Sequence, residues 1–114
     1  MTVKRQDSET FKTSKENIWT ILDEILDDGQ KAYSYINTRI IQHDDTIHTT
    51  IEHDYSPFTL STQLKITIQD KGDSTVVTAY TTSQWFIIGD IFNYYRKYIR
   101  DLFRSIEIKI KRQA

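Results

Sequence analysis

An unbroken apolar stripe of helical period runs through the last quarter of the sequence, between residues 88 and 111. A helix with one apolar face must pack that face against another element. At 1.5 Å per residue this helix would be about 35 Å long, so a broad surface has to cover it. The opposite face is mostly charged and is expected to meet solvent. The stripe consists of Ile88, Ile91, Phe92, Tyr95, Ile99, Leu102, Phe103, Ile106 and Ile110.

The middle of the chain predicts a sheet that can cover this helix. From Ala32 to Trp85 the period changes to two, and β-branched and tyrosine residues alternate with polar ones. This pattern is typical of strands with one buried face. Polar pairs interrupt it at residues 44–45, 56–57 and 71–72. We expect four strands in an antiparallel meander, with the three pairs as two-residue hairpin loops.

Two further elements precede the meander. Residues 3–11 form a weak strand candidate. A helix should follow, because Thr13 as N-cap and Glu16 three residues later match a capping box, and Gly29 is a natural stop. Apolar residues recur between these signals at helical spacing: Ile18, Trp19, Leu22, Ile25 and Leu26. We expect residues 1–114 to form a single α+β domain in the order strand, helix, four-strand meander, long helix.

Two-residue loops would fix the register of the meander, because the residue numbers of each opposed pair in a hairpin then add up to the same value. The inside of the sheet is identified by the apolar face of the strand that begins near Phe58. Two cross-strand rows of mixed polarity are predicted on that face. The first row contains Thr38, Ile51, Thr62 and Thr81, and the second contains Ile36, His53, Leu60 and Ser83, with Ile40 also turned inward.

The face that the last strand turns inward depends on the length of the loop before it. A three-residue loop in place of residues 71–72 would exchange the two faces of this strand. The residues then turned inward would be Val76, Thr78, Tyr80 and Thr82.

Two stretches and the order of elements resemble a known family. Residues Phe11 to Trp19 are similar to the strand-to-helix transition of the START-like superfamily, also called SRPBCC or helix-grip, and residues 89–111 are similar to its terminal helix. The resemblance covers essentially the whole chain but rests on patterns of residue type. It implies a bent antiparallel sheet of about five strands, with a short N-terminal helix and the long C-terminal helix on its concave face.

The same resemblance implies a hydrophobic-ligand binder as the commonest role. Members of the family usually have a longer first helical region and six or seven strands, so a sheet of about five implies a smaller or closed cavity. The fold also hosts enzymes, transporters and regulators, and therefore does not determine the function.

The mixed polarity of the inner face suggests where such a ligand would bind. Ligand pockets are mostly apolar with a few placed hydroxyl or imidazole groups, so we consider a small amphipathic ligand between the sheet and the C-terminal helix. In the ordinary alternative the threonines bond to neighbouring backbone or to one another. The candidate ligand-binding residues are Thr38, Ile51, His53, Tyr55, Thr62, Thr81, Ser83, Trp85 and Tyr95.

Neither catalysis nor metal binding is favoured. Burial would keep His53 neutral and suited to act as a base, but the sequence pairs no second acid, base or nucleophile with it. Strand parity puts His48 on the outer face and His53 on the inner one, which separates two of the three histidines that a metal would need. The chain has no cysteine, phosphate-binding glycine loop or dinucleotide fingerprint. We expect no catalytic residues, no metal and no cofactor.

The basic outer face of the C-terminal helix favours a different function. Residues Lys97, Arg100, Arg104 and Lys111, with Tyr94 and Tyr98 interleaved, would suit an interaction or regulatory module with a closed core. The ordinary alternative is a solvated face, since Asp101 and Glu107 interrupt the positive charge.

Composition limits the partners and the location of the chain. The net charge of −1 gives no general attraction to nucleic acid. The longest apolar run, residues 85–89, is far below the roughly 20 residues that span a bilayer. The first 15 residues lack the apolar stretch of a secretory signal. We expect a cytoplasmic monomer or homodimer without a nucleic-acid partner or a membrane span.

Overall fold

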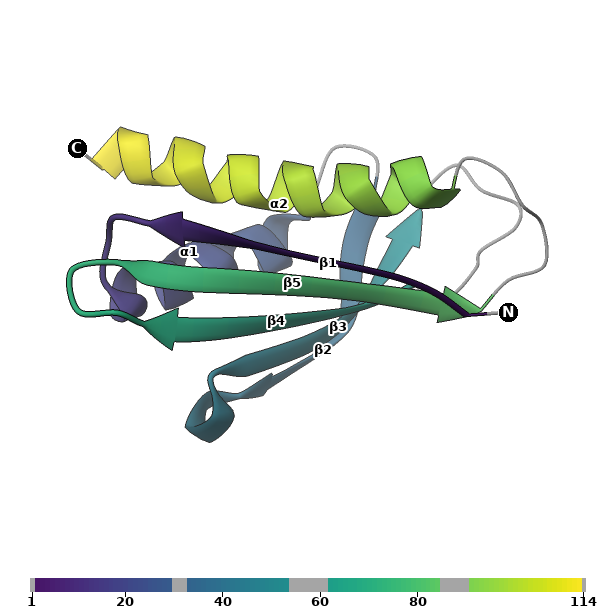
Figure 1. Ribbon diagram of the computed structural model, residues 1–114, viewed down its shortest axis with the longest axis horizontal. Helices are drawn as coiled ribbons and strands as arrows, with labels where there is room; N and C mark the ends of the chain where they lie inside the picture. The colour runs from purple at the N-terminus through teal and green to yellow at the C-terminus, as the bar shows by residue number, and fades with distance from the viewer. Residues whose placement is uncertain (1, 30–32, 54–61, 85–90, 114) are drawn as a thin grey trace.

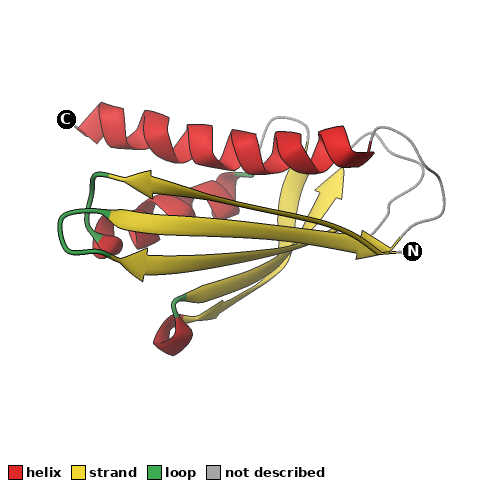
Figure 2. Cartoon of the chain, in the orientation of Figure 1, coloured by secondary structure: helices red, strands yellow, loops and turns green. Residues whose placement is uncertain are grey.

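The computed structural model describes residues 2–29, 33–53, 62–84 and 91–113, with side chains for 4–29, 34–52, 62–82 and 97–113. Five antiparallel strands form one sheet in the order β1-β5-β4-β3-β2. Figures 1 and 2 show α2 running along the length of the sheet and α1 packed behind it. The elements are β1 (Thr2–Phe11), α1 (Lys15–Asp28), β2 (Tyr33–Ile41), the short 3-10 helix η1 (Gln42–Asp44), β3 (Thr46–His53), β4 (Thr62–Asp70), β5 (Thr75–Gln84) and α2 (Ile91–Gln113).

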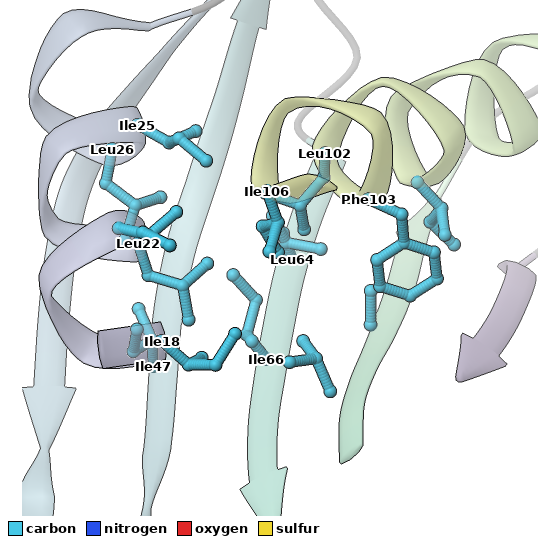
Figure 3. Packing of buried hydrophobic residues seen from close by; sticks show 14 of the residues in the cluster. Ile18, Leu22, Ile25, Leu26, Ile47, Leu64, Ile66, Leu102, Phe103 and Ile106 are labelled. Carbon is cyan, nitrogen blue, oxygen red and sulfur yellow. The ribbon is translucent and has the colours of Figure 1, made fainter. Parts of the chain in front are cut away.

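The predicted α+β order of elements is therefore confirmed. The core lies between the sheet and the two helices. Leu22 of α1, Ile66 of β4 and Leu102 of α2 are almost completely buried. Figure 3 shows these side chains converging from the three layers. The chain folds in this way because each helix and the sheet bury their apolar faces against one another.

Helix α1 begins one residue later than predicted. Its N-cap is Ser14, whose side chain accepts a hydrogen bond from the Asn17 backbone N–H at 3.1 Å. Thr13 instead completes the preceding turn, where its backbone carbonyl accepts a hydrogen bond from the hydroxyl of Thr75 at 2.8 Å. The capping box with Glu16 is thus wrong. The predicted end is confirmed, since Gly29 has φ 77° and its N–H donates to the Ile25 carbonyl.

The N-cap gives a first prediction. Ser14→Ala should lower the free energy of unfolding by about 1 kcal/mol, because it leaves one helix N–H without its acceptor. Thr20→Ala is the matched control, since Thr20 is exposed in the middle of α1 and Ala has the higher helix propensity. Urea denaturation of the three proteins would measure both changes. An equal loss of stability in the two variants would refute the assignment of Ser14 as the cap.

The register between β3 and β4 is as predicted, with Ile51 opposite Thr62. The loop between β4 and β5 is longer than predicted and spans residues 71–74. Gly72 has φ 96° there and donates its N–H to the Asp70 side chain, which closes a wider turn. The extra residues shift β5 by two positions, so the correct faces are kept while the predicted rows are wrong. Val77, Ala79 and Thr81 are buried as predicted, and the alternative with the other face of β5 inside is wrong.

Strand β2 differs most from its prediction. It reaches β3 through residues 42–45 rather than a two-residue loop, and its pairing shifts again between Ile36 and Arg39. Asn37 has φ 53° at this bulge. A bulge inserts an unpaired residue and therefore exchanges the faces of the strand beyond it. Tyr35 is consequently buried opposite Ile51, and Ile36, predicted to face inward, lies opposite Thr50 on the outer face. Beyond the bulge Thr38 and Ile40 keep the predicted face, beside Thr49 and opposite Ile47, but both are exposed there.

Helix α2 starts at Ile91 and ends at Gln113, close to the predicted span. Four residues of the apolar stripe, Ile99, Leu102, Phe103 and Ile106, are buried. Tyr98 is also buried, at 4% exposure, so its assignment to the basic outer face is wrong. No helix in the described ranges is long and apolar enough to cross a membrane.

Candidate functional site

Three of the predicted ligand-binding residues lie in one row across the sheet. Ile51 of β3 is opposite Thr62 of β4, and Thr62 is opposite Ser83 of β5. Tyr35 extends this row to β2. The side chains of Tyr35, Ile51 and Thr62 are all buried. The row therefore combines one apolar side chain with two buried hydroxyl-bearing ones on the face that α2 covers.

The other two predicted threonines occupy different positions. Thr81 is opposite Leu64, one row nearer the middle of the sheet, and its hydroxyl lies 3.4 Å from the Arg5 carbonyl oxygen. The Thr38 hydroxyl lies 2.9 Å from that of Thr49, which also lies 3.1 Å from the Ile36 carbonyl oxygen. Both side chains thus follow the ordinary alternative, in which threonines bond within the sheet.

The remaining candidates lie at the end of the molecule where α2 begins. His53 is the last residue of β3, and Tyr95 belongs to the first turns of α2, but their side chains and that of Ser83 are outside the described set. Tyr55 and Trp85 lie outside the described residues altogether.

A metal site would need several ligand side chains close together. Among the residues that the structure describes, no three His, Asp or Glu side chains come together as ligands.

The inner face changes in character along its length. Its middle is apolar, with Ile47, Ile66 and Ala79 in one row under the helices. At the far end the buried Thr75 donates to the Thr13 carbonyl oxygen of the adjoining turn. Toward the start of α2 the face instead carries the row of Tyr35, Ile51, Thr62 and Ser83. Polar groups and apolar surface are therefore combined at that end.

A second feature is an open groove of about 730 Å³ between β1 and α2. All four residues of the predicted basic face of α2, Lys97, Arg100, Arg104 and Lys111, are exposed, and two of these four line the groove. The sequence analysis missed the contribution of β1, because it assigned no partner to that strand. The lining is Arg5, Asp7, Ser8 and Glu9 from β1, with Ile99, Arg100, Phe103, Arg104 and Glu107 from α2.

Half of the charged residues that line this groove are already paired. Arg5 lies 3.1 Å from the Asp7 carboxylate, and Glu107 accepts from Lys111 at 3.1 Å. Lys109, on the neighbouring face of α2, contacts Glu24 of α1 at 3.0 Å. Within the described part of the chain, no ion pair or hydrogen bond occupies the side chains of Arg100 and Arg104. The groove therefore has two uncommitted guanidinium groups on its helical wall.

Comparisons with known proteins show the fold. Neither a protein-family model nor a curated protein matches the sequence. Ara h 8.0201 is similar over 96% of this chain and 98% of its own, with a TM-score of 0.70 at 11% identity. A START superfamily protein from Mycobacterium smegmatis aligns over 97% and 99%, with a TM-score of 0.65 at 13% identity.

Norcoclaurine synthase from Thalictrum flavum, in complex with dopamine and hydroxybenzaldehyde, aligns over 100% of this chain and 89% of its own, with a TM-score of 0.64 at 11% identity. Its likeness to this chain, like the other two, extends over nearly the full length of both proteins. The chain thus has the helix-grip fold of START-like proteins, as the sequence resemblance implied.

Proposed function

We propose that this protein binds a small amphipathic molecule between the sheet and the first turns of α2. The apolar body of the ligand would pack against Ile51 and the helix, and its polar end would bond to Thr62, Ser83 or His53. The observation that carries the proposal is the row of Tyr35, Ile51, Thr62 and Ser83, in which the buried side chains of Tyr35, Ile51 and Thr62 combine hydroxyl groups with apolar surface. Ligand pockets combine these two kinds of group.

The position of the row also supports a pocket at this end. The middle of the sheet is closely filled, because Ile18, Ile47, Ile66 and Ile106 are all at most 1% exposed. A ligand can therefore be accommodated only beyond the row that contains Thr81, toward the start of α2. We propose that Tyr55, Trp85 and Tyr95 provide aromatic walls there, as their places in the sequence suggest.

The structural neighbours support the ligand class. Norcoclaurine synthase, which has the same fold, is known in complex with dopamine and hydroxybenzaldehyde, two small aromatic molecules with polar groups. At 11% identity this likeness transfers no residue and no reaction. We propose binding rather than catalysis, since the sequence pairs no second acid, base or nucleophile with His53.

A cavity-filling substitution tests the proposal. Ile51→Trp should reduce the affinity for the hydrophobic probe 1-anilinonaphthalene-8-sulfonate at least tenfold, because the indole would occupy the space of the ligand. Ile40→Trp is the matched control, since Ile40 is 43% exposed on β2 and its replacement fills no interior space. Fluorescence titration would measure both affinities.

The stability of the same variant separates a cavity from a closed core. If a pocket adjoins Ile51, the indole is accommodated and the melting temperature changes little. Overpacking of a filled core instead costs about 1–3 kcal/mol. Unchanged probe affinity, or a loss of stability of that size in Ile51→Trp, would contradict the proposed pocket.

A further inference from the structure

The groove between β1 and α2 is not used by the proposed ligand site, which lies at the row of Tyr35, Ile51, Thr62 and Ser83 toward the start of α2. Its helical wall carries Arg100 and Arg104, both exposed and both without an ion pair in the described part of the chain. Its other wall is β1, which is an edge of the sheet and, among the described strands, pairs only with β5. An edge strand offers backbone N–H and C=O groups that an additional strand can use.

The dimensions of the groove suit an extended chain. Its β1 wall runs from Arg5 to Glu9, which is about 13 Å at the rise of a strand. Its α2 wall runs from Ile99 to Glu107, which is about 12 Å at the rise of a helix. The two walls are thus nearly equal in length and match about four residues of a peptide in the β conformation. Ile99 and Phe103, both buried, line the groove between these walls.

The spacing of the two arginines matches the same conformation. Residues four apart on a helix are displaced by about 6 Å along its axis. Side chains two apart on a strand lie on one face and are separated by about 6.7 Å. We propose that the groove binds an extended acidic segment of another protein, which adds to the free edge of β1 and pairs two acidic side chains, separated by one residue, with Arg100 and Arg104. Edge addition of this kind uses main-chain hydrogen bonds for affinity and side chains for specificity.

The charges of the groove favour a peptide over an anionic bilayer. Asp7, Glu9 and Glu107 line it together with the arginines, so a flat anionic surface would meet both attraction and repulsion. Arg5 and Lys111 neutralise two of these acids, which leaves Glu9 as the acid without an ion pair. A peptide can place a basic or neutral residue beside Glu9 and its acids beside the arginines. A bilayer cannot be arranged in this way.

Binding of a designed peptide tests the proposal on the full chain. The probe is a fluorescein-labelled octapeptide in which glutamate alternates with threonine and valine, and fluorescence anisotropy measures its affinity. The wild-type protein should bind it more tightly than a peptide of equal composition whose glutamates are adjacent. The double variant Arg100→Glu with Arg104→Glu should bind at least tenfold more weakly, because like charges then face each other.

Lys97→Glu is the matched control. Lys97 is exposed on α2, carries the same charge, and does not line the groove. Its reversal should cost clearly less affinity than reversal of Arg100 and Arg104, since Lys97 does not contact the groove and its exposed charge is partly screened by salt. Equal losses in the two variants, equal affinity for both peptides, or no binding at millimolar concentration would each overturn the proposal.

The outcome does not depend on the proposed ligand pocket. Reversal of Arg100 and Arg104 should leave the affinity for 1-anilinonaphthalene-8-sulfonate unchanged, because the proposed pocket lies toward the start of α2 and the groove beside residues 99–107. Loss of peptide binding with intact probe binding therefore supports the groove alone. Association of two copies of the chain that the double variant abolishes, with no peptide binding, would identify the groove as a dimer contact and overturn the proposed occupant.

Discussion

Leu102→Ala should lower the free energy of unfolding by about 2–5 kcal/mol. Leu102 is completely buried in α2, and Figure 3 shows its side chain directed at the sheet close to Leu64. Truncation removes apolar contacts and leaves a cavity that the neighbouring elements can fill only in part. Because a domain of this size is stable by only about 5–15 kcal/mol, the variant should show a clearly lower denaturation midpoint.

Ile108→Ala is the control on the same helix. Ile108 is 40% exposed, so its truncation removes little buried surface and should cost well below 1 kcal/mol. Urea denaturation followed by circular dichroism would compare the two variants with the parent chain. A loss below about 1 kcal/mol in Leu102→Ala would show that α2 is not held on the sheet by the contacts described.

Thr75→Val is expected to have the second largest effect, a loss of about 1–3 kcal/mol. Thr75 is completely buried, and its hydroxyl donates to the Thr13 carbonyl oxygen at 2.8 Å. This hydrogen bond joins the start of β5 to the turn between β1 and α1. Valine has nearly the same shape but no donor, so the Thr13 carbonyl would lose its partner without a change in packing volume.

Thr78→Val, also in β5, is the control. It makes the same change of residue type without removing the hydrogen bond between Thr75 and Thr13. The Thr78 hydroxyl lies 2.8 Å from that of Ser8 on the exposed side of the sheet, where water can replace the lost partner. Its substitution should change the free energy of unfolding by no more than about 0.5 kcal/mol. Equal effects of the two substitutions would mean that the link between Thr75 and Thr13 contributes nothing specific.

The elements that depend on hydrophobic periodicity could be predicted from the sequence. The buried residues of α1 and α2 recur at helical spacing, and Ile47, Thr49 and Ile51 of β3 alternate with more exposed residues. Such patterns are local, because one face of each element is turned to the core. The inner faces of β4 and β5 were also predicted correctly, because they follow the same local pattern.

Positions that depend on backbone conformation could not be predicted. The loops at residues 42–45 and 71–74 are each two residues longer than assumed, and Asp45 adopts a left-handed conformation in the first. Asn37 produces a bulge that no hydrophobic pattern indicates, and before this bulge Tyr35 faces inward in place of Ile36. Because each error moves a whole strand, the predicted rows were wrong even where the faces were correct.

The groove was missed for a different reason. The basic residues Arg100 and Arg104 were identified, but their position beside β1 follows from long-range pairing of β1 with β5. The sequence did contain an indication of this position. Arg5, Asp7 and Glu9 have the same strand parity as Phe11, which places these charges on the same face as a buried aromatic residue. Charged side chains on that face are typical of an edge strand.

The most direct test of the proposed ligand site is a nuclear magnetic resonance titration of the ¹⁵N-labelled chain with 1-anilinonaphthalene-8-sulfonate. We predict that the amide resonances of Ile51, Thr62 and Ser83 shift together and saturate at one ligand per chain, while those of Ile47 and Glu9 stay unchanged. Shifts confined to the groove between β1 and α2, near Glu9, would contradict a ligand site between the sheet and the first turns of α2. The absence of a saturable shift at Ile51, Thr62 and Ser83 would contradict it as well.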